Sequence, residues 1–175
     1  MDELEEIIAK ANAGSAEAQV HLGDYFASSE EEKGSALAYD WYQRAAVNGS
    51  VEGLYKLGKC YYVGVGVEKD IPWALTCWRL AGELGYSNAL YMIGSSYVRG
   101  LYKDYSTALY WWRRAAGLQN PFGQCMLGLC YKNGYGVPID KAVAEKWFRL
   151  AALQGNETAR HELIDNPNDS LVGGD

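Results

Sequence analysis

A leucine or isoleucine followed directly by glycine recurs along the chain at nearly constant spacing. The four pairs are Leu22-Gly23, Leu57-Gly58, Ile93-Gly94 and Leu127-Gly128, at steps of 35, 36 and 34 residues. An aromatic residue follows three positions after each glycine: Phe26, Tyr61, Tyr97 and Tyr131. A period of this length is typical of stacked arrays of small helical units, each of which buries its apolar face against its neighbours. The chain is therefore predicted to be a repeat protein.

A second series of small residues keeps step with the first. Each unit has two alanines seven residues apart, a spacing that places both on one face of a helix. The pairs are Ala38 and Ala45, Ala74 and Ala81, Ala108 and Ala115, and Ala144 and Ala151. Between them stand Trp41-Tyr42, Cys77-Trp78, Trp111-Trp112 and Trp147-Phe148. Each unit is thus expected to be two helices, A then B, with the five tryptophans of these pairs mainly in the core.

The two kinds of connection differ in length. The step from the second alanine to the next glycine is 13 residues each time, whereas the step from glycine to second alanine within one unit varies between 21 and 23. Stacking requires a fixed turn from B to A, so insertions are expected only in the A-to-B loop. There, Asp70, Asp104 and Asp140 are predicted N-caps of the B helices. Glycines are expected to end the preceding A helices: Gly64, Gly66, Gly134 and Gly136.

The repeated pattern resembles the Sel1-like repeat, a relative of the tetratricopeptide repeat. Repeat four fits it best, through Gly123, Leu127-Gly128, Tyr131, Gly134, Gly136-Val137, Asp140, Ala144, Trp147 and Ala151-Ala152. Repeat one lacks the glycine pair and the aspartate, and repeat two has Gly82 for the second alanine of its Ala-Ala pair. The resemblance implies an all-α protein, a right-handed α-solenoid of stacked antiparallel helix pairs.

The expected organisation covers nearly the whole chain. Residues 1–14 are predicted to be a capping helix, residues 15–155 four repeats, residues 156–166 a second capping helix and residues 167–175 a disordered tail. The repeats are expected at about 15–50, 51–86, 87–120 and 121–155.

Charge and composition limit the classes of partner that are expected. The chain has 16 Lys and Arg against 22 Asp and Glu, and residues 1–32 hold nine acids and one base, so nucleic acid is not an expected partner. The chain opens without a basic start and apolar run, and it has no apolar stretch of about 18 residues, so we expect a cytoplasmic location and no membrane partner. Cys60, Cys77, Cys125 and Cys130 are expected to be buried free thiols.

Enzyme motifs are weak in this sequence. His21 and His161 lie about 140 residues apart, and a repeat contacts only its neighbours, so a paired histidine site is not expected. A Gly-x-Ser-x-Gly motif does not occur. We therefore expect no catalytic site, no cofactor and no metal, and a hydrolase remains the alternative of another class.

The A helices carry the expected binding surface. In tetratricopeptide-like stacks, as the resemblance implies, these helices line the concave face. The candidate partner-binding residues are Tyr55, Lys59, Tyr62, Tyr91, Ser95, Val98, Arg99, Phe122, Leu129 and Lys132. Exposed aromatic clusters of this kind mark interaction sites, although each residue could equally serve packing, and the A-to-B loops could carry binding instead.

The expected function is that of an adaptor or scaffold that binds a protein or peptide. The chain is expected to be a monomer alone and a hetero-complex with its partner. A cognate inhibitor, such as an immunity protein held against a toxin, is the alternative within the same class.

Overall fold

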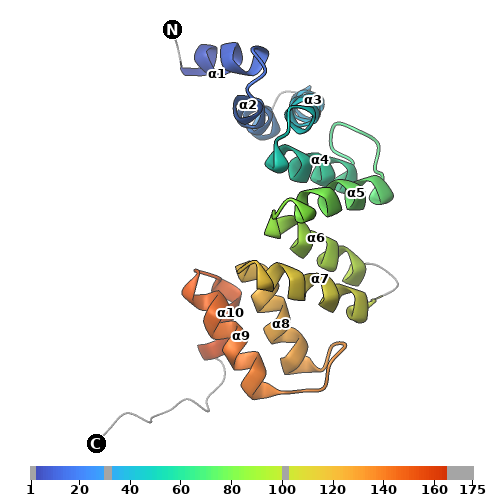
Figure 1. Ribbon diagram of the computed structural model, residues 1–175, viewed down its shortest axis with the longest axis vertical. Coiled ribbons are helices and arrows are strands. Elements are labelled where there is room, and N and C mark those ends of the chain that lie inside the picture. The colour runs from blue at the N-terminus through green and yellow to red at the C-terminus, as the bar shows by residue number, and fades with distance from the viewer. Residues whose placement is uncertain (1–2, 30–32, 100–102, 165–175) are drawn as a thin grey trace, which may run out of the picture. The chain divides into compact units, whose positions relative to one another are not determined.

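The computed structural model describes residues 3–29, 33–99 and 103–164, and these contain ten helices and no strand (Figure 1). The helices of the first half are α1 (Glu3–Asn12), α2 (Ala16–Ser28), α3 (Gly34–Val47), α4 (Val51–Val63) and α5 (Ile71–Glu83). Those of the second half are α6 (Ser87–Val98), α7 (Tyr105–Gly117), α8 (Pro121–Asn133), α9 (Lys141–Leu153) and α10 (Glu157–Ile164). The expected all-α architecture is confirmed. The tail predicted at 167–175 lies outside the described residues.

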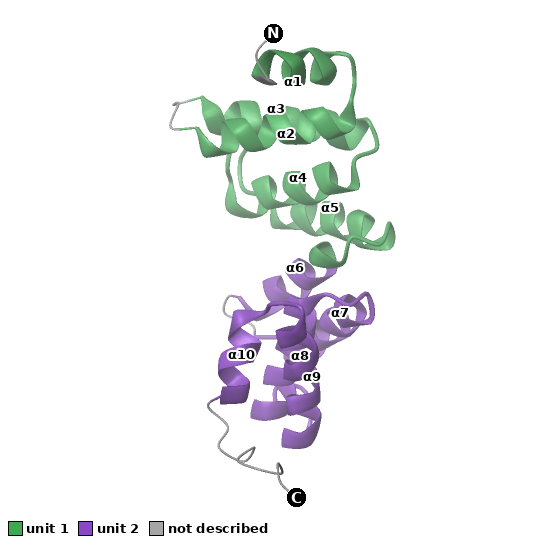
Figure 2. Cartoon of the chain, turned by 90° about the vertical axis from the view of Figure 1, so that its left-hand side faces the viewer, with its two compact units in different colours: residues 1–89 green, residues 90–175 purple. Residues whose placement is uncertain are grey.

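The chain divides into two compact units, residues 1–89 and 90–175, with the boundary inside α6 (Figure 2). Within each unit, helices that follow one another in sequence pack side by side. In unit 1, α2 packs on α3 and α4 on α5; in unit 2, α8 packs on α9 and α9 on α10. A division into two units was not anticipated from the repeat.

The B helices begin at the predicted aspartates. The side chains of Asp70, Asp104 and Asp140 accept hydrogen bonds from backbone N–H groups three residues later, at 2.9, 3.0 and 2.9 Å. Hydrogen bonds at Thr107 lower the pKa of Asp104. The A helices α2, α4 and α8 also have side-chain caps, from Ser15, Ser50 and Asn120. Each cap satisfies a backbone donor that the helix itself leaves unpaired.

The repeated glycines receive aromatic rings from the B helices. A Cβ at Gly128 would lie 2.5 Å from Cε1 of Phe148, and one at Gly58 would lie 2.5 Å from Nε1 of Trp78. Gly23 meets Tyr42 and Gly94 meets Trp112 in the same way. The backbones of α3 and α4 approach each other closely at a different glycine, Gly53. A Cβ there would lie 2.9 Å from the backbone nitrogen of Ala46. The glycine of each repeated pair therefore leaves space for an aromatic ring of the following B helix.

The expectation that the five tryptophans lie mainly in the core is met in part, since two are fully buried and Trp41 and Trp147 pack partly buried against core clusters. Trp78 and Trp112 are fully buried, with Tyr42 and Phe148 buried at the same position in the other repeats. Trp41, Trp111 and Trp147 remain partly exposed. Adjacent residues of a helix point about 100° apart, so the residue beside each buried ring points in another direction and keeps part of its surface open.

The four cysteines are buried and free, as predicted. Burial raises the pKa of each thiol to about 11. Two further results concern only the described residues. None of their helices combines the length and apolar character needed to cross a membrane, and their His, Cys, Asp and Glu side chains form no group of three or more suited to a metal ion.

Candidate protein-binding surface

Three candidate residues lie on α4 in unit 1. Lys59 is exposed, whereas Tyr55 and Tyr62 are partly buried. The Tyr55 ring lies 5.0 Å from the ring of Tyr86, and Nζ of Lys59 lies 5.9 Å from the centre of the Tyr55 ring. Tyr62 packs at 5.2 Å against Trp78. Each tyrosine thus has one side held by its own repeat and part of its surface open to solvent.

A groove beside these residues extends from α2 to α4 and has a volume of about 270 Å³. Apolar side chains line much of it, including Ala27, Val63 and Val65, and Val63 is 61% exposed. Lys59 lies at its edge and forms no ion pair with a described residue. The groove therefore combines open apolar surface with a lysine that has no ion-pair partner among the described residues.

A hydrogen-bonded cluster closes one wall of this groove. Asp24 accepts a hydrogen bond from the Tyr42 hydroxyl at 2.6 Å and from Nζ of Lys56 at 2.6 Å. Lys56 also lies 3.4 Å from Glu52. The cluster joins α2, α3 and α4, so it fixes the walls of the groove.

The cluster also shifts two pKa values. Burial, together with Asp24, raises the pKa of the Tyr42 hydroxyl. Burial lowers the pKa of Lys56, but the hydrogen bond and charge of Asp24 outweigh it, so the net shift is upward. Lys56 is therefore a charged structural residue. It was not among the candidate partner-binding residues that the sequence predicted.

In unit 2, Tyr91 of α6 and Phe122 of α8 form a ring pair with centroids 5.4 Å apart. Phe122 is 50% exposed, and Arg99 is exposed as well. Val98 packs against the core cluster formed by α7 and α8. Of these four candidates, Phe122 and Arg99 offer the most open surface.

Three further candidates have little surface or charge available to a partner. Ser95 is buried, with 6% of its surface exposed, and a partner cannot reach it, so its assignment to the binding surface is wrong. Leu129 packs partly buried against the cluster that joins α8, α9 and α10. Lys132 forms an ion pair with Glu162 on α10, so its charge is already balanced. Helix α10 therefore covers the part of the candidate surface that Leu129 and Lys132 form.

Four of the candidate residues, Tyr55, Tyr62, Tyr91 and Val98, would form one continuous patch only by drawing on both units. Its first two residues belong to unit 1 and its last two to unit 2. Its continuity stays a prediction.

The two histidines are exposed and lie in different units, His21 on α2 and His161 on α10. Neither is among the residues that line the α2–α4 groove. That groove is lined by apolar side chains together with two lysines, one tyrosine and Asp24, and this composition suits binding of a chain segment.

Comparison with solved structures supports the fold. A protective antigen of uropathogenic Escherichia coli with an SLR fold is 35% identical, with a TM-score of 0.79 over 93% of this chain and 36% of its own. A Sel1 repeat protein from Oxalobacter formigenes is 30% identical, with a TM-score of 0.81 over 91% of this chain and 65% of its own. An immunity protein from Pseudomonas aeruginosa, 22% identical, has a TM-score of 0.66 over 86% of this chain and 57% of its own, which shows a shared fold alone.

Sequence comparison gives the family. Chitin synthase regulatory factor 3 of Schizosaccharomyces pombe is 29% identical over 130 residues, which cover 71% of this chain and 14% of that protein. The chain thus spans a small part of this longer relative. The Sel1 repeat model matches four segments, residues 16–50, 51–86, 87–120 and 121–156. The chain belongs to the Sel1 repeat family.

Proposed function

We propose that this chain is a non-catalytic adaptor that binds a segment of a protein partner on the A-helix surface of unit 1. Sel1 repeat proteins act as protein-interaction modules, and this membership supports the class of function. The α2–α4 groove carries the proposal for the site, because it joins open apolar surface at Val63 and Val65 to the charge of Lys59, which forms no ion pair with any residue that the structure describes.

The groove chemistry suggests which segment binds. An aliphatic side chain of the partner would enter between Val63 and Val65, and a neighbouring carboxylate would pair with Lys59. Lys56 would stay with Asp24 and Glu52, because those two carboxylates already hold it at 2.6 and 3.4 Å. Tyr55 and Tyr62 would extend the contact along α4, since aromatic residues commonly dominate binding energy at interfaces.

The relative's name supports action through another protein. That relative is named a chitin synthase regulatory factor. We propose for this chain the same general mode, regulation or assembly through binding, without assigning it the same target.

The test compares capture of partners by two charge-matched double variants. In Lys59→Glu with Val63→Asp, both changes lie on exposed groove residues, so the melting temperature should stay near that of the wild type. The control, Lys146→Glu with Leu153→Asp, makes the same change of charge on a lysine and an aliphatic residue, both exposed on α9. Partners retained by wild type and control, measured by quantitative mass spectrometry, should be lost from the groove variant.

An unchanged set of captured proteins on the groove variant would remove the α2–α4 groove as the site. The same partner also separates an adaptor from an inhibitor. An adaptor leaves its partner's activity in place, whereas an immunity protein abolishes the activity of a partner that is itself a toxic enzyme.

A further inference from the structure

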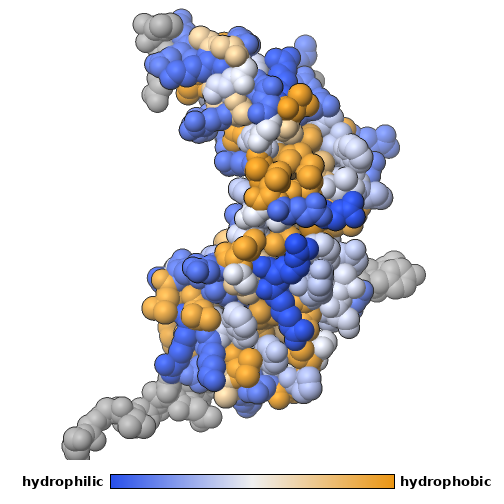
Figure 3. Space-filling view, viewed as in Figure 1, coloured by the Kyte–Doolittle hydropathy of each residue, from blue (hydrophilic) through white to orange (hydrophobic). Residues whose placement is uncertain are grey.

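A second groove in unit 1 lies on the side of the B helices. It runs between α3 and α5 with α4 at its floor, and its volume is about 340 Å³. Its wall residues include Val47, Trp73 and Leu80, which are 82%, 50% and 47% exposed. Figure 3 shows hydrophobic surface gathered over α4 and α5 in this unit. This groove is separate from the α2–α4 groove of the proposed function.

Repeat two has a smaller residue at one position where the other three repeats have tryptophan. The residue three positions after the first alanine of the B helix is Trp41, Trp111 and Trp147 in repeats one, three and four, but it is Cys77 in repeat two. Cys77 lines the groove. The side chain of Cys77 is smaller than the indole ring that the other repeats carry at this position.

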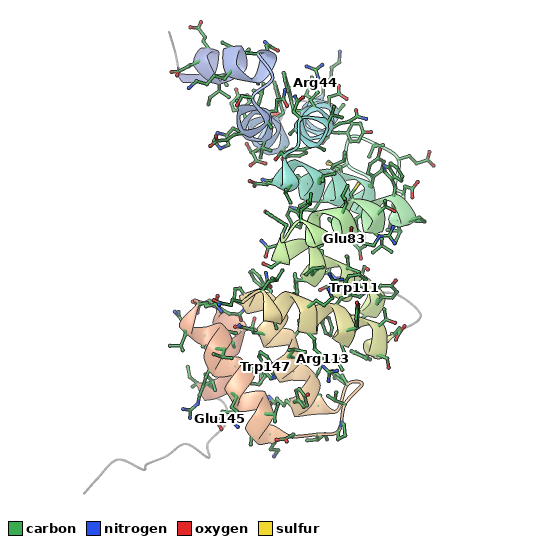
Figure 4. The ribbon with its side chains drawn as sticks, viewed as in Figure 1. Arg44, Glu83, Trp111, Arg113, Glu145 and Trp147 are labelled. Atoms are coloured by element: carbon green, nitrogen blue, oxygen red, sulfur yellow. The ribbon has the colours of Figure 1, made fainter. Side chains whose placement is uncertain are left out.

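Unit 2 shows how the tryptophan sits when it is present. Trp147, labelled in Figure 4, packs from α9 against a cluster that includes Ala116 of α7 and Leu127 of α8. The residues at the same repeat positions in unit 1 are Ala46 and Leu57, and both line the groove at Cys77. The wall that receives the ring is therefore preserved in unit 1.

The first repeat gives a second example within unit 1. Trp41 packs from α3 against the cluster of Ala11, Ala18 and Leu22, which belongs to α1 and α2. Its place relative to the preceding helix pair is the one that Cys77 holds relative to α3 and α4, where Cys77 joins the cluster with Ala38 and Leu57. Two repeats thus show an indole ring where repeat two shows a thiol.

The polarity of the groove selects an uncharged ring. None of the described residues that line it is charged, and burying a charge without a partner is costly. The Thr76 hydroxyl already donates to the carbonyl of Pro72 at 3.0 Å, and the hydroxyls of Tyr61 and Tyr39 are hydrogen-bonded to each other at 2.9 Å. The amide of Gln43, also at the groove, makes no hydrogen bond to a described residue and can accept one from an indole N–H.

We propose that this groove binds the tryptophan side chain of a partner protein, which supplies in trans an indole ring beside the position where repeat two has Cys77. The preserved wall at Ala46 and Leu57 supplies the apolar contact, and Gln43 supplies the acceptor for the indole N–H. A neutral, apolar lining matches an indole ring and disfavours a lysine, arginine or carboxylate in its place.

The first test fills the groove with a side chain of the protein itself, by the substitution Cys77→Trp. Binding of the blocked peptide Gly-Trp-Gly is followed by NMR, with blocked Gly-Lys-Gly as the negative probe. Wild type should bind the tryptophan peptide saturably at one site. Cys77→Trp should lose that binding and should melt no lower than wild type, because its own ring takes the place that Trp41 and Trp147 take in their repeats.

A matched substitution separates filling from loss of the thiol. Cys77→Ala leaves the groove open, so it should keep binding the tryptophan peptide. If Cys77→Trp binds as wild type does, or if it melts clearly lower, the groove is not a site for an indole ring. Equal binding of the lysine peptide to wild type would overturn the proposal as well.

The second test creates the groove elsewhere. Trp147→Cys should open the corresponding space in unit 2, and the stoichiometry of peptide binding should rise from one to two. The variant should melt lower than wild type, and added indole should raise its melting temperature more than it raises that of Cys77→Trp. A stoichiometry that stays at one, without this recovery by indole, would contradict the assignment.

The third test concerns a second copy of the chain. Trp73 is half exposed beside the groove, so sedimentation of the wild type is measured alongside the peptide titrations. A monomer is expected. A dimer that Cys77→Trp converts to a monomer would assign the groove to self-association and overturn binding of a separate partner.

Discussion

Gly128 on α8 illustrates how a single hydrogen atom in place of a side chain can be required by the fold. The Phe148 ring lies against it, and Phe148 is itself 3% exposed. The ring cannot move toward solvent without uncovering the cluster it shares with Cys125 and Ala151. Side-chain size at this position is therefore controlled by a ring from the next helix.

We expect Gly128→Val to lower the free energy of unfolding by about 1–3 kcal/mol, because the added atoms must displace the Phe148 ring. The control is Gly117→Ala at the end of α7, where an added Cβ meets nothing within 4 Å. That substitution should be neutral or stabilising by up to about 1 kcal/mol. Urea denaturation measures both, and similar losses for the two variants would argue against close packing of the Phe148 ring on Gly128.

The buried thiols make stability depend on alkaline pH. Burial raises the pKa of Cys130 from 9.0 to about 11, so the folded chain holds a proton that the unfolded chain releases. This contribution is complete below pH 9 and is lost as the pH rises toward 11. Cys130→Ala should reduce the fall in unfolding free energy over that interval, by at most about 2–3 kcal/mol.

Unfolding measured at both ends of this pH interval tests the thiol contribution. Alkylation gives an independent readout, because a buried neutral thiol reacts slowly. All four cysteines should resist iodoacetamide in the folded protein at about pH 8 and react fully in urea. Rapid labelling of the folded protein, or an unchanged pH dependence in Cys130→Ala, would count against this account.

At the scale of the helix, the B helices depend on aspartate caps at their first turn. Asp140 accepts a hydrogen bond from the backbone N–H of Val143 at 2.9 Å. The loop before it ends with the backbone N–H of Asp140 donating to the carbonyl of Tyr131, also at 2.9 Å. One residue thus starts α9 and ties its first turn back to α8.

Asp140→Ala should destabilise the protein by about 1 kcal/mol, because one backbone donor of α9 loses its acceptor. Asp140→Asn keeps a side-chain oxygen and should cost much less. We also expect the loss in Asp140→Ala to be smaller than that in Gly128→Val. Denaturant unfolding of the three variants gives the order, and a larger loss for the cap would mean that Gly128 tolerates a side chain.

At the scale of the whole molecule, the two kinds of connection have different structural roles. The turns from each B helix to the next A helix use a left-handed backbone at Gly49, Gly85, Gln119 and Gly155. In unit 1, the turn at Gly49 is followed by the cap Ser50, whose N–H donates to the carbonyl of Ala45 at 2.8 Å. The turn therefore fixes how α4 packs on α3.

An insertion of three residues after Gly49 should cause a large drop in melting temperature, because it breaks the fixed packing of α4 on α3. The same insertion after Glu68, an exposed residue of the loop from α4 to α5, should cost well below about 1 kcal/mol, since loop closure depends weakly on length. Thermal unfolding followed by circular dichroism compares the two. An equal loss of stability from the two insertions would refute the expectation that the turn has a fixed length and the loop does not.

The sequence by itself determined the all-helical repeat and the aspartate caps of repeats two to four, because both depend on local spacing along the chain, and the apolar character of the four cysteines indicated their burial. Asp70, Asp104 and Asp140 form caps with their own neighbours in sequence, so their role needs no distant contact. The exposed parts of the candidate surface were also predictable in part, as Lys59, Arg99 and Phe122 show.

Only the tertiary structure decided which residues of a helical stripe are available. Ser95 and Lys59 occupy the same repeat position, yet Ser95 is buried and Lys59 is exposed. The pairing of Lys132 with Glu162, and of Asp24 with Lys56, joins residues about 30 positions apart. The groove at Cys77 likewise depends on volume left between three helices. Spacing along one helix fixes the direction of a side chain, whereas its burial depends on the neighbouring helices that cover it.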